Sequence, residues 1–483
     1  MPIISITPPV TSSIIADVSD SLYLINASVD VSFDETALIV PDGTANQIIR
    51  NFGSLSTADT AVDIGTGIDG TATTFVNETG GIIRSETIPF NSARADLTLI
   101  NYGSIGSTFS AGLSHAGSNS TIYNFGSISG FLDGAFISGD HNLIINTGAI
   151  FGGSIGLGLA FSGSGSRLDN YGNITASFDE VAVLVSADRS MANMEINNSG
   201  TIDSDRGIQI RTDPGGEIDG FDIRNDGTVF GSVTGIDISG DVDGVRIVNS
   251  GDVSGYSGAI RIDVIDPNAL IIIENQSSGV VENFDFSTDP EGAIIADTGR
   301  QFVLNSGTID GDVTLGAQDD RYVGEGAGEV NGAVFGGDGD DRLFGSDEND
   351  RLFGDAGRDF VFGGGGNDTI FGGADQDQLF GDEGSDRFVF TTETDSQDDD
   401  AENDNQYDVI RDFEVGVDQI DLSGIGLFAG FDDDGGQTEA GELRLAYSAA
   451  SDRTYLRSDQ SVFEVALSGD FRATLTEDDF IFV

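Results

Sequence analysis

Apolar and polar residues alternate along this chain in two long repeats, and neither repeat has the 3.6-residue period of an amphipathic helix. Between Asn26 and Asn305 the recurring marker is an apolar residue, an Asn, a Gly two positions later and a second apolar residue, as in INYGSI at 100–105. Eleven intervals between these Asn residues span 279 residues, about 25 residues each. Two further short apolar stretches occupy most intervals. Three short strands and three turns per interval predict one coil of a parallel β-helix.

The marker residues have predicted roles in this β-helix. Stacked Asn side chains can hydrogen-bond from coil to coil as a ladder, and we expect the Gly two positions later to adopt the left-handed conformation of a turn. The predicted β-helix covers 26–313 with about eleven coils, and 1–25 are expected to cap its open end. The pattern resembles the N-x-G-x-I solenoids of bacterial surface proteins and autotransporter passengers, which implies a right-handed parallel β-helix.

A nonapeptide repeat replaces the longer one at 336–389, in six copies without a break. Each copy begins with Gly, has Asp at its sixth position and has an apolar residue at its eighth. The Gly-rich half favours a turn, and the second half favours a short strand with one inward side chain. Two copies form one coil of a flattened roll, so turns n and n+2 are expected to stack at the strand spacing of about 4.8 Å.

Stacked turns of this kind would concentrate oxygen atoms. Carboxylates and turn carbonyls suit calcium, which takes about six to eight oxygen ligands, and without a cation the carboxylates would repel one another. The predicted carboxylate ligands are Asp341, Asp350, Asp359, Asp368, Asp377 and Asp386. The predicted turn glycines of the metal sites are Gly336, Gly339, Gly345, Gly354, Gly357, Gly363, Gly366, Gly372, Gly381 and Gly384. Pairing n with n+2 across six copies predicts four calcium ions or more.

The repeat matches G-G-x-G-x-D-x-U-x and therefore resembles the RTX, or hemolysin-type, calcium-binding repeat. The resemblance implies a parallel β-roll over 314–390. Some copies depart from the pattern, and we expect weaker calcium binding at those turns. Glu348 and Asp375 replace the fourth-position Gly, and Ser346, Asp355 and Asp382 replace the second. An earlier partial copy at 315–323 aligns Asp320 with the repeated Asp.

The remaining segment, 391–483, contains DVIRDFEVGVDQIDLS at 408–423 and ends in an acid followed by four apolar residues, Asp479 to Val483. Together with the repeats, it resembles the C-terminal part of serralysin-type secreted proteins. That resemblance implies a β-rich secretion domain, an uncleaved C-terminal signal, and a type I secretion apparatus as partner. It also implies that the chain folds on calcium after export, outside the cell or at its surface. The N-terminal residues lack the features of a cleaved signal peptide.

Composition narrows the possible partners. The net charge is −61 and all 21 basic residues are Arg, which argues against nucleic acid and anionic membranes as partners. The chain has no Cys, so thiol chemistry and thiolate metal sites are excluded. No apolar run is long enough to insert into a bilayer.

Two functions remain. The first is an extracellular structural or adhesive protein, with a cell-surface or matrix polysaccharide as a further partner. The alternative is an extracellular polysaccharide lyase, hydrolase or epimerase with its site on the β-helix. No catalytic residue is predicted, because His115 and His141 are expected to be surface turn residues, and Asp188 and Arg189 part of a solvated face. A groove lined by Asp with Arg or His from three adjacent coils would favour an enzyme, and uniform ridges of Ser, Thr, Asn and Gly would favour adhesion.

Overall fold

The structure is a computed structural model of the whole chain. It describes residues 2–8, 10, 12–65, 72–153, 158–177, 180–284, 292–396, 407–425, 430–431, 442–458 and 463–482. Val483, the last residue of the predicted export signal, lies outside the described residues, as do parts of the predicted secretion domain. Two compact units make up the chain, Met1–Ile265 and Asp266–Val483. The predicted domain boundaries at 25, 313 and 390 stay predictions.

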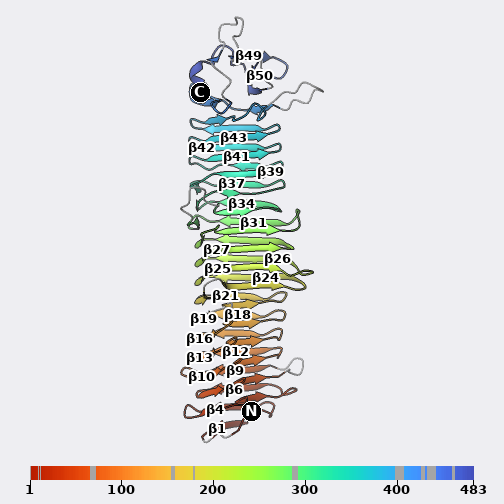
Figure 1. Cartoon of the computed structure of the whole chain (residues 1–483), viewed down its shortest axis with the longest axis vertical. Coiled ribbons are helices and arrows are strands. Elements are labelled where there is room, and N and C mark those ends of the chain that lie inside the picture. Colours follow the sequence, from red (N-terminus) through yellow and green to blue (C-terminus); the bar gives the residue numbers. More distant parts are fainter. Residues whose placement is uncertain are drawn as a thin grey trace. The chain divides into compact units, whose positions relative to one another are not determined.

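The first unit is a parallel β-solenoid, and most of its coils have three strands, as the 25-residue repeat predicts (Figure 1). In two coils the second and third strands are continuous, as β25 (Thr201–Thr212) and β27 (Thr228–Gly240). One coil consists of β12 (Leu97–Asn101), β13 (Ser104–Ser107) and β14 (Leu113–His115). Each of these strands pairs in parallel with the equivalent strand of the next coil. The strands that end at the marker Asn form one column. They are β6 (Gln47–Asn51), β9 (Thr73–Asn77), β12, β15 (Thr121–Asn124), β18 (Leu143–Asn146), β21 (Arg167–Asn170), β24 (Ser190–Asn198), β26 (Glu217–Asn225) and β28 (Val242–Asn249).

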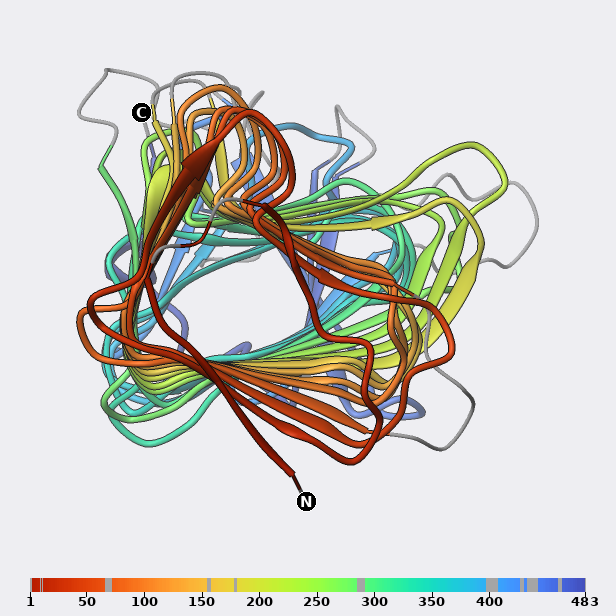
Figure 2. The same cartoon turned by 90° about the horizontal axis from the view of Figure 1, so that it is seen from below.

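Side chains alternate between the interior and the surface of each coil. In β12, Leu97, Leu99 and Asn101 are buried, while the residues between them are half-buried. This is the two-residue period of a strand with one face on a core. Seen along the axis in Figure 2, the coils of this unit (red to yellow) lie over one another around one interior. The core is therefore a stack of inward-facing Ile, Leu and Val layers.

The marker Asn side chains form the predicted ladder. From Asn51 to Asn249, each Asn donates its Nδ2 hydrogen to the Oδ1 atom of the Asn in the next coil, at 2.8–2.9 Å. The second unit repeats this bond between Asn275 and Asn305, at 2.9 Å. Most of these amides also donate to a backbone carbonyl, and all are buried. Asn26 is outside the ladder and donates to the Ile6 carbonyl instead.

The predicted role of the marker Gly was wrong. None of the Gly residues two positions after the ladder Asn has a positive φ, so left-handed freedom is not the reason for Gly here. A Cβ atom on Gly126 would overlap the carbonyl oxygen of Gly103, and one on Gly148 would overlap that of Gly126. The coils approach too closely at this turn for any side chain. Glycine is required by contact between coils.

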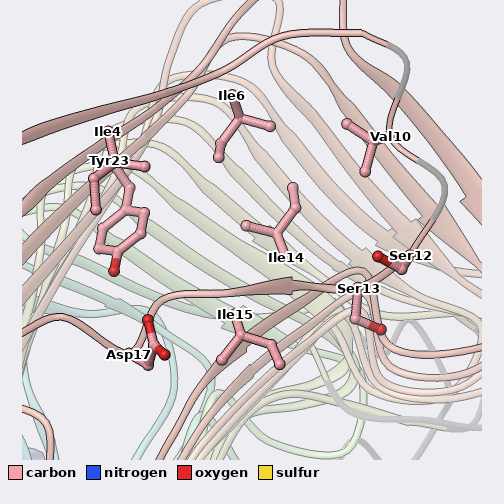
Figure 3. Close-up of a pocket in the computed structure, with 9 residues that line it drawn as sticks. All are labelled: Ile4, Ile6, Val10, Ser12, Ser13, Ile14, Ile15, Asp17 and Tyr23. Atoms are coloured by element: carbon pink, nitrogen blue, oxygen red, sulfur yellow. The ribbon is translucent and has the colours of Figure 1, made fainter.

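The first coil begins with β1 (Ile3–Ile6), which pairs in parallel with β3 (Leu22–Ile25). Together with β2 (Ile14–Ile15) these strands border a hollow of about 400 Å³ (Figure 3). Ile3 and Ile15 are 66% and 54% exposed, as expected for a coil that leaves part of its apolar surface uncovered. Capping by this segment stays a prediction.

In the second unit the coil shrinks from three strands to two. One column contains β31 (Leu270–Asn275), β34 (Arg300–Asn305), β37 (Arg321–Gly324), β40 (Arg342–Phe344), β42 (Phe360–Gly365) and β44 (Gln378–Glu383). The facing column contains β39 (Val334–Asp338), β41 (Arg351–Ala356), β43 (Thr369–Ala374) and β45 (Arg387–Val389). Strands 18 residues apart pair in parallel, for example Leu352 with Ile370. This is the flattened roll that the nonapeptides predict.

The C-terminal residues continue the roll and then add antiparallel strands. β46 (Asp408–Ile410) pairs with β44, and β47 (Gln419–Asp421) with β45. Further along, β49 (Glu442–Ser448), β50 (Arg453–Ser458) and β51 (Glu464–Ser468) form an antiparallel meander. A single helical turn, Glu477–Asp479, precedes β52 (Phe480–Ile481), which pairs with β47. The described residues are otherwise all-β, and they include no helix able to cross a membrane.

Replacing one ladder residue should weaken the solenoid measurably. In Asn146→Ala, the Nδ2 group of Asn124 loses its side-chain acceptor while it stays buried. We expect a loss of about 1–3 kcal/mol in the free energy of unfolding, measured by chemical denaturation of the full chain. Asn173→Ala is the control, because Asn173 is exposed and its ladder contact uses only the backbone carbonyl. Equal destabilisation by both variants would contradict the ladder's role.

Candidate metal centre

Two columns of buried aspartates follow the two turn edges of the roll. In the first column, the backbone N–H of Asp341 donates to Oδ1 of Asp359, and that of Asp359 donates to Oδ1 of Asp377, both at 2.8 Å. In the second, Asp350 donates to Asp368 at 2.8 Å and Asp368 to Asp386 at 2.9 Å. The structure thus brings together the aspartates that the n and n+2 rule groups, three on each edge.

The other carboxylate oxygen is what distinguishes these aspartates. Oδ2 is buried and has no hydrogen-bond partner among the described residues in five of the six repeated aspartates. They are Asp341, Asp359, Asp368, Asp377 and Asp386. Burying a carboxylate oxygen without a partner costs about 1–3 kcal/mol or more, so five such oxygens in one roll fit a cation-binding site. Hard oxygen donors of this kind fit calcium.

The turns bring backbone groups close to these oxygens. A Cβ on Gly354 would overlap Oδ2 of Asp359, and one on Gly372 would overlap Oδ2 of Asp377. The first Gly of a nonapeptide is therefore needed because the carboxylate lies directly against it. The second and fourth positions have positive φ in five of the six copies. This left-handed backbone favours glycine and is tolerated by Asp.

The second nonapeptide differs from the others. Its Ser346 and Glu348 replace the two left-handed positions, and neither has a positive φ. Oδ2 of Asp350 accepts hydrogen bonds from the Ser346 backbone N–H, at 2.6 Å, and from the Ser346 hydroxyl, at 3.0 Å. The protein itself satisfies the oxygen that the other five copies leave unpaired. Ser346 and Glu348 therefore change the backbone conformation of their turn. Asp355, Asp375 and Asp382 also replace Gly, but they keep the left-handed backbone.

Burial makes the carboxylates hard to ionise without a cation. Desolvation is the largest cause in each case, and neighbouring carboxylates add to it. It raises the pKa of Asp341 and Asp386 to about 6, of Asp368 to about 7, of Asp359 to about 8 and of Asp377 to about 10. It raises the pKa of Asp350 as well, although the bonds from Ser346 oppose that shift. A divalent cation would supply the charge that keeps these groups ionised.

The types of ligand atom in these turns also limit which metal ions could bind there. The described residues contain no group of three or more His, Cys, Asp or Glu side chains placed to hold a metal ion. An ion in these turns would combine the aspartate oxygens with backbone carbonyl oxygens and water. Carbonyl and carboxylate oxygen together suit calcium and do not suit zinc or copper, which prefer nitrogen and sulfur.

The predicted residues are only part of the arrangement. Three second-position glycines that were not predicted, Gly337, Gly364 and Gly373, also have a positive φ, as the fourth-position glycines do. The first column also continues at both ends: at Asp320, as the partial copy at 315–323 predicts, and at Asp408, which was not predicted. Asp320 N–H donates to Oδ1 of Asp341 and Asp377 N–H to Oδ1 of Asp408, and both Asp320 and Asp408 have an unpaired buried Oδ2. The signal for Asp408 was the Asp-x-apolar motif in DVI, after a longer insertion.

The nonapeptide segment matches a known family of repeats. The family described as "RTX calcium-binding nonapeptide repeat (4 copies)" matches residues 335–370 and 357–388. These residues are RTX calcium-binding repeats. The roll of nonapeptides and its two aspartate columns are thus the RTX segment of a longer parallel β-solenoid.

Curated relatives from Azotobacter vinelandii share this type of repeat. Mannuronan C5-epimerase AlgE3 is 43% identical over 100 residues, 20% of this chain and 5% of that protein. Alginate lyase 7 is 40% identical over 100 residues, 11% of its length, and mannuronan C5-epimerase AlgE4 is 40% identical over 17% of its length. The chain therefore spans a small fraction of the relatives it matches.

Two solved structures are also similar to part of the chain. They are the AlgE6R3 and AlgE6R2 subunits of an Azotobacter vinelandii mannuronan C5-epimerase, 38% and 30% identical. They cover 30% and 36% of this chain and 80% and 92% of their own, with TM-scores of 0.26 and 0.24.

The two histidines are in different environments. His141 is an exposed turn residue with φ of 58°, as predicted. The prediction for His115 was wrong, because its side chain points into the core and is fully buried. Burial lowers the pKa of His115 to about 4. The apolar surroundings of the strand explain this, and neither histidine joins the aspartate columns.

Asp359→Asn should change stability in opposite directions with and without calcium. The amide keeps Oδ1 as acceptor for Asp341 N–H but removes the buried charge. In excess chelator we expect unchanged or greater stability, and in saturating calcium we expect a lower melting temperature and about tenfold weaker calcium binding. Calorimetry of calcium binding and thermal unfolding measure the two effects. Asp340→Asn is the control, because Asp340 is exposed and keeps its acceptor role toward Arg358. Destabilisation under both conditions would contradict a metal-ligand role.

The calcium-free roll should lose stability as pH rises. Its aspartates bind protons more tightly when folded, with pKa values of about 6 to 10 against about 3.9 unfolded. Their stabilising contribution is complete below pH 4 and is lost as pH increases through the folded values. Thermal unfolding in excess chelator should therefore give a lower melting temperature at pH 8 than at pH 5. Calcium should abolish or reverse the trend, and a melting temperature that rises with pH in chelator would refute this account.

Proposed function

We propose that this chain is a secreted calcium-binding protein whose RTX roll folds when calcium binds after export, and whose three-strand solenoid has a structural or adhesive role. The observation that carries this proposal is the set of five buried, unpaired Oδ2 atoms. A roll that buries uncompensated carboxylates is unstable without a cation, so calcium binding free energy acts as folding free energy.

The C-terminal residues support export before folding. Asp479 is 1% exposed; its Oδ1 accepts from Gly416 N–H and its Oδ2 from Thr476 N–H, both at 2.7 Å. The following residues pair with β47. In the folded chain this end is thus docked on the roll, and a type I secretion apparatus, the proposed partner, could read it only while the roll is unfolded. Low cytosolic calcium would keep it in that state.

The proposed number of ions is four or more, from stacked turns of six nonapeptides. Extracellular calcium modules bind with Kd values on the order of 10⁻⁴ to 10⁻³ M, and this range would separate the unfolded interior state from the folded exterior one. A cell-surface or matrix polysaccharide is the proposed binding partner. The net charge of −61 disfavours nucleic acid and anionic membranes.

The alternative function is modification of an extracellular polysaccharide. The relatives are named as mannuronan epimerases and an alginate lyase, but each match spans about 100 residues and 5–17% of the relative's length in the cases above. A match of that extent transfers no catalytic residue to this chain. One observation favours the alternative: a groove on the first unit is lined by Asp140, Asp188, Asp213 and Arg189, which come from three coils, as expected for an enzyme. No catalytic role is assigned to these residues, and the structural or adhesive role remains the proposal.

A calcium titration of the full chain followed by far-UV circular dichroism tests the proposal. We expect β-structure to increase above a calcium threshold, with cooperative uptake of at least four ions measured by calorimetry. Magnesium is the control cation, because it demands near-ideal octahedral geometry and keeps several waters. A spectrum that is identical in chelator and in calcium would show that the roll folds without metal and would refute calcium-induced folding.

A further inference from the structure

A hollow of about 700 Å³ opens on the outer face of the first unit. It extends over five successive coils, beside β14, β17 (Ala135–Ile137), β20 (Leu159–Phe161), β23 (Val181–Ala187) and the end of β25 (Thr201–Thr212). Its volume lies within the range of about 300–1,000 Å³ that is typical of ligand sites. It is separate from the RTX roll, which belongs to the other unit.

One side of the hollow is apolar. Phe136, Ala160 and Leu184 occupy the same outward-facing position on three consecutive strands, in register. Outward residues of a solenoid strand are normally exposed, yet Ala160 and Leu184 are only 5% and 7% exposed. Phe136 is 45% exposed and presents its ring at the margin. The column is a recessed apolar floor with one accessible aromatic ring.

A column of hydroxyl groups runs beside this floor. Ser138, Ser162 and Ser186 lie two residues after Phe136, Ala160 and Leu184, and all three serines line the hollow. They repeat at the strand spacing of about 4.8 Å. The column is limited by Ala116 one coil before and by Arg211, which pairs with Ser186, one coil after.

Charged turn residues form the remaining wall. Asp140, Asp188, Asp213 and Arg189 line the hollow. Arg189 pairs with Asp140 at 2.9 Å across 49 residues of chain, and the Ser186 hydroxyl donates to Asp213 at 3.3 Å. Three carboxylates and one guanidinium give the wall a net charge of −2. Asp188 and Arg189, which were predicted to belong to a solvated face, therefore line this hollow.

We propose that this groove binds a neutral, hydroxyl-rich oligosaccharide. Sugar rings combine apolar C–H faces with polar edges, which match a floor of apolar side chains between hydroxyls and carboxylate acceptors. The carboxylates can accept sugar hydroxyl protons, and Ser hydroxyls can donate or accept. The negative wall acts against polyuronates, since like charges oppose binding. The inference rests on the proposed adhesive function and names its ligand class.

An extended peptide is a poorer fit to the same surface. Ser138 N–H donates to the His115 carbonyl and Ser162 N–H to the Ile137 carbonyl, both in the preceding coil. These strands are paired on both sides, so they offer no free edge to which a peptide strand could add. Recognition must use side chains, as the hydroxyl column and the aromatic ring allow.

The test is binding of calcium-loaded full-length protein to neutral hexasaccharides of glucose, mannose and galactose, compared with a hexauronate and with oligolysine, by calorimetry. At least one neutral hexasaccharide should bind more tightly than the hexauronate and oligolysine. Phe136→Ala should weaken that binding about 3- to 10-fold, the value of one aromatic contact. Phe151→Ala is the matched control, because Phe151 is 43% exposed in β19 (Ala149–Gly152) and does not line the hollow. Ser162→Phe, which fills the groove, should abolish binding.

Each other result overturns the inference. Tighter binding of the hexauronate or of oligolysine would assign the groove to a charged ligand. Equal losses in Phe136→Ala and Phe151→Ala would place the glycan elsewhere. Absence of binding to all neutral hexasaccharides, with circular dichroism showing a folded calcium-loaded chain, would refute the groove while leaving calcium-induced folding intact.

Discussion

The structure depends on one repeated constraint: a polar side chain in each coil must bond to the equivalent position of the next coil. In the first unit that side chain is Asn, which both donates and accepts, so Asn124 accepts a hydrogen bond from Asn101 and donates one to Asn146. In the RTX roll it is Asp, which only accepts when ionised. Asp359 therefore takes its hydrogen bond from a backbone N–H and retains a second oxygen that receives no hydrogen bond from the residues described. The exchange of an amide for a carboxylate separates a self-sufficient stack from one that requires a cation.

Because of this difference, the two stacks respond differently to pH and to calcium. The Asn ladder contains no titratable group, so neither pH nor calcium acts on it directly. The aspartate columns respond to both, because burial raises the pKa of their carboxyl groups and calcium competes with protons for the same oxygens. Ser346 shows that the protein can satisfy such an oxygen internally, since its backbone and hydroxyl both donate to Asp350.

Much of this architecture could be predicted from the sequence, because stacking places equivalent positions of successive repeats next to one another. The 25- and 9-residue periods predicted strand number, the Asn ladder and the grouping of aspartates by edge. The reason for glycine could not be read in the same way: left-handed torsion and close approach both require Gly, and only the structure separates Gly126 from Gly339. His115 was misplaced because one residue of strand register decides between core and surface. The hollow beside Phe136 depends on side chains from five coils, and no single repeat contains that pattern.

The coils of the first unit differ in length, although the Asn ladder that joins them does not change. Consecutive bonded Asn residues are 22 residues apart between Asn124 and Asn146 and 28 apart between Asn170 and Asn198, yet both side-chain bonds are 2.8 Å. All of the extra chain is therefore accommodated outside the ladder. Evolution can lengthen or replace a turn without altering the shared core, so the outer surface of such a solenoid can diversify one coil at a time while its fold is inherited unchanged.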